Sequence, residues 1–120
     1  MRGNNFEIPI LFLIFNRPNL TSKVFSMITE IKPKKLYVAC DGPRNTDNEM
    51  QIVSQVRKIT NHVTWDCNLK KLYRNHNLGC KNAVSGALDW FFENEDKGII
   101  LEDDCLPNKD FFLFCKELLL

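Results

Sequence analysis

The sequence lacks the phosphate-binding motifs of the common nucleotide folds. Neither G-x-G-x-x-G nor G-x-x-x-x-G-K-[ST] occurs, so a dinucleotide-binding or P-loop fold would have no backbone cradle for phosphate. There is no Ser-centred nucleophile elbow. A phosphoaspartate enzyme would carry Asp after its first apolar run, and Asn16 stands there instead. These absences argue against four familiar classes of α/β enzyme.

The chain also has little net charge and no metal-binding cysteine pattern. A net charge of +1 gives no overall attraction to nucleic acid or acidic membranes, so we expect no nucleic-acid partner. The five cysteines include no CxxC pair, and the histidines show no ligand spacing, so neither a zinc site nor a disulfide framework is supported. We therefore expect reduced, mostly buried thiols in a cytoplasmic protein.

Long apolar runs are missing as well. No stretch approaches the ~18 apolar residues that a membrane-spanning helix needs. Residues 8–15 follow Arg2 and superficially resemble a secretory signal, but the run is short, contains Pro9 and has no small-residue cleavage site. We predict a buried strand there and no transmembrane segment.

What the chain does contain is an alternation of apolar runs and amphipathic segments. Strands are predicted at 8–15, 36–40 and 98–105, with a further strand at either 63–65 or 72–73. Helices are predicted after Pro18, after a Thr46-x-x-Glu49 capping box, after Gly79 and after an Asn108 cap. Such alternation predicts one α/β domain with a parallel sheet and right-handed crossovers.

Three of the predicted strands end in polar residues. The clusters are Asn16-Arg17-Pro18, Asp41-Gly42-Pro43-Arg44 and Glu102-Asp103-Asp104. Because parallel strands all point the same way, the clusters should meet at the sheet edge where open α/β sheets bind ligands. Three adjacent carboxylates repel each other unless a cation compensates them. The pattern therefore predicts a divalent cation that bridges carboxylate and pyrophosphate oxygens of a nucleotide.

Each candidate also has a purely structural interpretation. The acidic trio could be a solvated turn, Asp41 could be only a turn residue, and Arg17 could simply pair with a nearby acid. Lys81, near a helix N-terminus, could approach a diphosphate, although a solvated lysine is the simpler interpretation. The position directly after a strand favours a functional role for Arg17, Asp41 and Asp104.

Four stretches resemble the nucleotide-binding half of a GT-A-fold glycosyltransferase of the N-acetylglucosaminyltransferase I type, and more loosely the inverting family 2 enzymes. They are residues 10–18, 38–42, 75–79 with the following helix, and the acidic strand 99–104 with the P-x-x-D-F-F stretch at 107–112. The resemblance implies a Rossmann-like, three-layer α/β/α fold with a mostly parallel sheet. Residues 1–120 would then form a single domain, the donor-binding part, without the acceptor-binding part.

The resemblance also implies an enzyme that binds a UDP-sugar and transfers the sugar with inversion to a saccharide or other acceptor. Asp104 would contact Mn²⁺ or Mg²⁺, while Arg17 and Asp41 would contact the nucleoside. The implied donor-binding residues are Asn16, Arg17, Asp41, Lys81, Glu102 and Asp103. Nothing matches the family's general base, which follows the metal strand. The helical pattern is still running at Leu120, so we expect a truncated chain.

Two alternatives stay open. A sugar-1-phosphate nucleotidyltransferase also uses a Rossmann-like sheet with acidic metal ligands, but it normally has a Gly-rich loop with Arg and Lys where this chain has Asn16-Arg17-Pro18. The second alternative is a non-catalytic nucleotide-binding remnant of the same fold.

Overall fold

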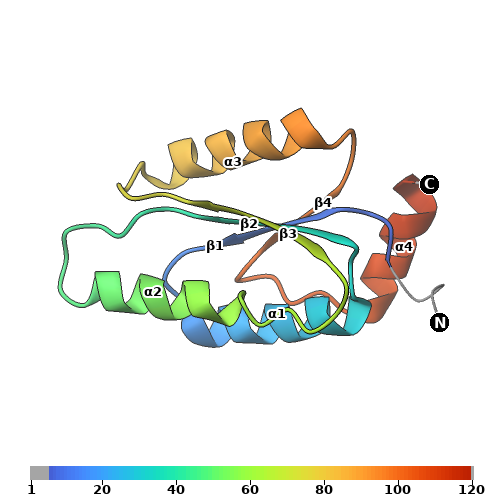
Figure 1. The fold of residues 1–120 in the computed structure, drawn as a ribbon, viewed down its shortest axis with the longest axis horizontal. Helices are drawn as coiled ribbons and strands as arrows, with labels where there is room; N and C mark the ends of the chain where they lie inside the picture. Colours follow the sequence, from blue (N-terminus) through green and yellow to red (C-terminus); the bar gives the residue numbers. More distant parts are fainter. Residues whose placement is uncertain (1–5, 120) are drawn as a thin grey trace.

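The apolar runs of the sequence form a four-stranded sheet, and the amphipathic segments form helices around it (Figure 1). The computed structural model describes residues 6–119. Its elements in chain order are β1 (Ile10–Ile14), α1 (Pro18–Ile31), β2 (Lys35–Cys40), α2 (Glu49–Ile59), β3 (Asn68–Tyr73), α3 (Cys80–Asn94), β4 (Ile99–Glu102) and α4 (Lys109–Leu119). The strand order is β3-β2-β1-β4, and every pairing is parallel. The predicted α/β class with a parallel sheet is confirmed, and the arrangement is compatible with a Rossmann-like fold.

The helices cover both faces of this sheet. Figure 1 shows α3 on one side of the strands and α1 and α2 on the other. Because side chains alternate across a strand, Phe12 and Val38 pack with α1 and α2, whereas Leu11 and Tyr37 pack with α3. Burial on both faces explains why β1 and β2 are almost uninterrupted apolar runs.

The face covered by α3 depends on one large aromatic residue and one glycine. Phe91 is fully buried, and its ring lies 4.8 Å from that of Tyr37, centroid to centroid. Gly98 precedes β4, and a Cβ there would overlap the Phe91 ring and lie 2.9 Å from the carbonyl oxygen of Pro9. The absence of a side chain at residue 98 therefore allows α3 to approach the sheet closely.

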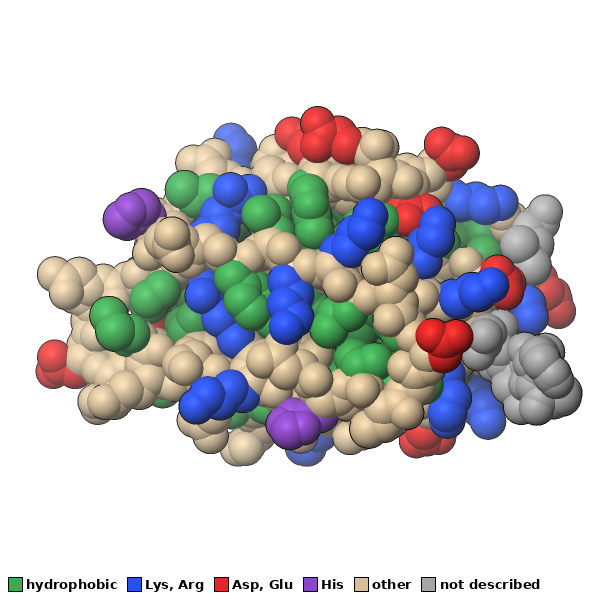
Figure 2. All heavy atoms as spheres, in the orientation of Figure 1, with side chains coloured by type: hydrophobic (Ala, Val, Ile, Leu, Met, Phe, Trp, Pro, Cys, Tyr) green, Lys and Arg blue, Asp and Glu red, His purple; other side chains and the backbone are tan. Residues whose placement is uncertain are grey.

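The third strand was the ambiguous element, and the structure places it at β3. Residues 72–73 belong to it, whereas residues 63–65 do not. Trp65 instead packs beside Phe25 and donates its indole N–H to the carbonyl of Pro33 over 2.7 Å. Lys70 and Lys71 are exposed on β3, which is an edge strand. Figure 2, in the orientation of Figure 1, shows Lys and Arg side chains interleaved with hydrophobic ones across the middle of the visible face. Exposed lysines protect an edge strand from aggregation but weaken its apolar signal in the sequence.

The two predicted helix caps have different outcomes. The Asn108 cap is confirmed, since its Oδ1 accepts the Phe111 N–H over 2.9 Å. The Thr46-x-x-Glu49 capping box is wrong, because α2 begins at Glu49 and Asn48 precedes it with φ 64° and no side-chain cap bond. The Glu49 carboxylate has other partners, described below.

The cysteines and helices bear on two further expectations. All five cysteines are free thiols, but only Cys40 is buried; Cys80 and Cys105 are exposed, so the expectation of mostly buried thiols is wrong. No helix within residues 6–119 has the length and apolar character needed to cross a bilayer.

Candidate functional site

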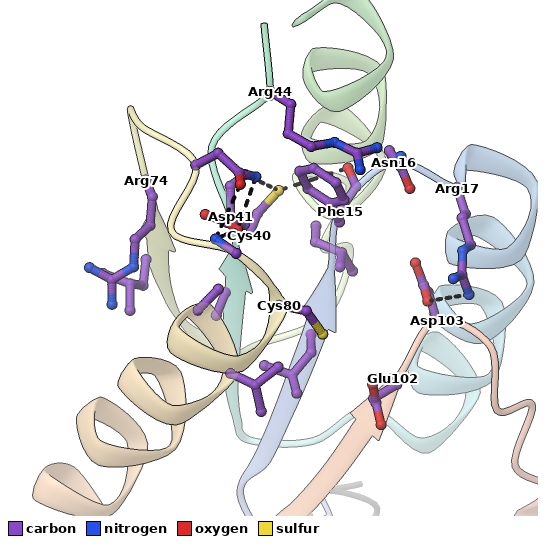
Figure 3. Close-up of a pocket in the computed structure, with 18 of the residues that line it drawn as sticks. Phe15, Asn16, Arg17, Cys40, Asp41, Arg44, Arg74, Cys80, Glu102 and Asp103 are labelled. Atoms are coloured by element: carbon purple, nitrogen blue, oxygen red, sulfur yellow. Dashed lines mark hydrogen bonds and ion pairs between the residues drawn. The ribbon is translucent and has the colours of Figure 1, made fainter. Parts of the chain in front are cut away.

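A pocket of about 390 Å³ opens at the carboxyl ends of the strands (Figure 3). Six of the seven residues predicted for the site line it: Asn16, Arg17, Asp41, Glu102, Asp103 and Asp104. Lys81 does not line it and is exposed on the first turn of α3. The pocket also takes in Arg44, Arg74 and Asn77, which were not predicted as site residues.

Strand register explains why residues so distant in sequence meet here. Ile14 of β1 pairs with Cys40 of β2, and Leu13 of β1 pairs with Glu102 of β4. The three strands therefore end within a residue of one another. Their next residues leave the sheet together, which places Asp41 and Asp103 at the same edge.

The acidic end of the pocket is organised around one arginine. Nη1 of Arg17 lies 3.6 Å from Oδ1 of Asp103 and 3.8 Å from Oδ2 of Asp104. Burial raises the pKa of the Asp103 carboxyl, Arg17 opposes that shift, and the nearby Asp104 and Glu102 charges add to it. Two carboxylates thus converge on a single positive charge at the end of β4.

This donor set fits a hard divalent cation of the kind implied by the resemblance. Within residues 6–119, no group of three or more His, Cys, Asp or Glu side chains could by itself hold a metal. Mg²⁺, however, is commonly bound by only one or two carboxylates together with water and substrate phosphates. Asp103 and Asp104 supply two such carboxylates, and both lie within 3.8 Å of the same Arg17 nitrogen.

The opposite end of the pocket is organised around Asp41. Its Oδ1 accepts the backbone N–H groups of Gly42 and Leu78 over 2.8 and 2.9 Å. Its Oδ2 accepts the Asn77 side-chain amide and the Gly79 N–H over 3.1 and 3.2 Å. One carboxylate therefore holds the loop that leads into α3, the same loop that the sequence resemblance singled out.

Gly42 makes this attachment possible. The backbone of His76 packs directly against residue 42, and a Cβ there would lie 2.5 Å from the His76 carbonyl carbon. The loop carrying Asn77 could not reach the end of β2 if residue 42 had a side chain.

Glu49 is a buried carboxylate near this edge, and the sequence analysis missed its role. Oε1 accepts the backbone N–H and Nε–H of Arg44 over 2.6 and 2.9 Å. Oε2 accepts Nη2–H of Arg44 over 2.7 Å and the amide of Asn16 over 3.2 Å. The Arg44 guanidinium, more than any other group, lowers the pKa of Glu49 to about 2. The partner Asn16 is 33 positions away, so no local pattern could reveal the contact.

Arg57 was also missed. From α2 it donates to the carbonyls of Asp41 and Arg74 over 3.1 and 2.8 Å, and its guanidinium lies 4.8 Å from the Tyr73 ring centroid. It therefore ties the ends of β2 and β3 together. Cys40 lies beside this group, but burial raises the pKa of its thiol, which favours packing over nucleophilic chemistry.

Comparison with known proteins gives no match: no protein-family model, curated protein or solved structure is significantly similar to this chain.

Proposed function

We propose that the chain is the donor-binding part of a GT-A-type glycosyltransferase that binds a UDP-sugar together with Mn²⁺ or Mg²⁺. One observation supports this most strongly: the ends of β1, β2 and β4 bring Arg17, Asp41 and the acidic trio to a single pocket. Open parallel sheets bind nucleotides at this edge. The proposal includes the three-layer α/β/α arrangement of that family and inverting transfer to a saccharide or other acceptor.

The pocket has a suitable size and charge distribution for such a donor. Its volume of about 390 Å³ falls within the range typical of small-molecule sites. Carboxylates lie at the β4 end, whereas Arg44 extends above the Phe15 ring and Asn16 lies beside that ring (Figure 3). A ligand with an ionic diphosphate and a planar base could contact both ends at once.

In this proposal, Asp104, with Asp103 beside it, holds the metal. The bound metal would neutralise charge on the departing diphosphate. Glu102, exposed at the end of β4, contacts the sugar or ribose. Arg17 leaves its ion pairs with Asp103 and Asp104 and contacts the nucleotide instead. We assign no general base.

The sugar-1-phosphate nucleotidyltransferase alternative has less support. The turn after β1 contains Pro18 at the start of α1 and no glycine, so it offers no chain of free backbone N–H groups to a triphosphate.

A cytoplasmic location stays a prediction from composition.

A calorimetric titration with UDP, in the presence and absence of Mn²⁺, tests the proposal. We expect binding that requires the metal and weakens at least about tenfold in Asp104→Ala, because one of the two converging carboxylates is lost. Asp96→Ala is the matched control, since this exposed aspartate precedes the amino end of β4. Metal-independent binding would instead favour a non-catalytic nucleotide-binding module, and no binding of UDP by the wild type would refute the proposal.

A further inference from the structure

Asp41 has no acceptor capacity left for a ligand. An ionised carboxylate offers about four lone-pair sites. The Asp41 carboxylate accepts four hydrogen bonds, all from its own turn and from the loop before α3. A nucleotide base in this pocket would therefore need another side chain to accept its N–H group.

Asn16 can supply that acceptor because Glu49 fixes its orientation. A carboxylate can only accept hydrogen bonds, so Asn16 must turn its amide nitrogen towards Glu49, and the two groups lie 3.2 Å apart. The Oδ1 of Asn16 accepts no hydrogen bond from any residue between 6 and 119. Since Asn16 lines the pocket, this oxygen is available to a ligand.

Arg44 is fixed by the same carboxylate. Nε and Nη2 both donate to Glu49, and Nη1 has no hydrogen-bond partner among residues 6–119, which makes it the free end of the guanidinium. The group lies over the Phe15 ring, 5.6 Å from its centroid. Figure 3 shows Arg44 extending above Phe15 towards Asn16. An acceptor, a donor and an aromatic ring are thus grouped at one end of the pocket.

Glu49 itself does not line the pocket but is buried behind these residues. Among residues 6–119, the Glu49 carboxylate bonds only to Asn16 and Arg44. Burying a charge is costly unless it is paired. The Glu49 carboxylate is paired through Asn16 and Arg44, so its contacts fix the positions of those two side chains.

We propose that Glu49 is a positioning residue that holds Asn16 and Arg44 to bind the edge of a uracil base. Oδ1 of Asn16 accepts the N3–H group, and the free end of Arg44 donates to an adjacent carbonyl oxygen. This inference rests on the proposed function and specifies which base the pocket selects. Cytosine carries an unprotonated N3 at the same position, so it would present an acceptor to the acceptor of Asn16.

The test uses the full 120-residue chain with Mn²⁺ and compares three ligands by calorimetry. UDP carries the N3–H group, 3-methyl-UDP lacks it, and ribose 5-diphosphate lacks the base. We expect the wild type to bind 3-methyl-UDP about five- to tenfold more weakly than UDP, the effect of one lost hydrogen bond. Glu49→Gln and Asn16→Ala should each weaken UDP binding by a similar factor and leave binding of ribose 5-diphosphate unchanged.

Glu95→Gln is the matched control. The Glu95 side chain is about as buried as that of Glu49, 10% exposed against 6%, and pairs with Lys35 at the start of β2, away from the pocket. This variant should lose stability and keep the affinity for all three ligands. A loss of ribose 5-diphosphate binding in Glu49→Gln would show a merely structural role and overturn the inference.

The outcomes separate this inference from the proposed function. If the wild type binds UDP with Mn²⁺ but binds 3-methyl-UDP equally well, the base-recognition inference is wrong and the proposed function stands. If the wild type does not bind UDP, both are wrong. Should Glu49→Gln fail to fold, the wild type with 3-methyl-UDP and the Asn16→Ala variant decide the question.

Discussion

Replacing Asp41 with Asn should weaken the attachment of the loop before α3 to the end of β2. Asn keeps one acceptor oxygen and replaces the other with an NH₂ group. That group would face two N–H donors, either those of Gly42 and Leu78 or those of Asn77 and Gly79. Whichever way the amide turns, two hydrogen bonds are lost and two donors are opposed.

The expected loss of stability can be estimated from those bonds. Hydrogen bonds to a charged group contribute about 1.5–3 kcal/mol each, and the lower end applies to the half-buried Asp41. We therefore expect the free energy of unfolding to fall by about 2–4 kcal/mol. For a domain of this size, that corresponds to a decrease in Tm of roughly 8–16 °C.

Urea denaturation measures the change, with Asp89→Asn as the control because Asp89 is exposed on α3. Amide hydrogen exchange then locates it. In Asp41→Asn, the amides of Leu78 and Gly79 should lose protection, while those of β1 should change only through global stability. Unchanged unfolding together with unchanged protection at Leu78 and Gly79 would refute the assigned role of Asp41.

Three further changes test other parts of the structure. The pKa of Glu49 is about 2 in the folded protein against 4.5 ordinarily, so the ionised carboxylate stabilises the fold above pH 4.5, and this stabilisation is lost as the pH falls through 2. Urea denaturation between pH 4.5 and pH 2 should show this loss of stability in the wild type but not in Glu49→Gln. Arg17→Ala should bind Mn²⁺ about threefold more tightly without nucleotide, because no cation then competes for Asp103 and Asp104, and unaltered affinity would argue against a shared cation position. Gly98→Ala should lower the free energy of unfolding by about 1–3 kcal/mol through overlap with the Phe91 ring, whereas Gly86→Ala, which meets only the end of the Arg74 side chain, should not.

The sequence predicted the parts of the fold that depend on local apolar patterns. The runs that became β1 and β2 are buried on both faces, so their composition was unambiguous. Parallel pairing then followed from the alternation of elements, and convergence of Arg17, Asp41 and Asp104 followed from parallel pairing. No residue contact had to be known for this inference.

The parts that were missed depend on contacts between distant residues. The Thr46-x-x-Glu49 spacing matched a capping box, but Arg44 and Asn16 compete for the Glu49 carboxylate, and these charge-assisted bonds replace the cap. The saturation of Asp41 likewise depends on Gly42 and on a loop 36 positions further along the chain. The spacing of residues along the sequence does not reveal either set of contacts.

The most direct test of the central claim, that three strand ends form one nucleotide–metal pocket, is paramagnetic line broadening by Mn²⁺ in the presence of UDP. We expect the backbone amide signals of Asp103 and Asp104 to broaden most, those of Arg17 and Asp41 to broaden next, and that of Lys97, before the amino end of β4, to stay sharp. Broadening centred away from the carboxyl ends of β1, β2 and β4, or broadening that UDP does not affect, would contradict the claim.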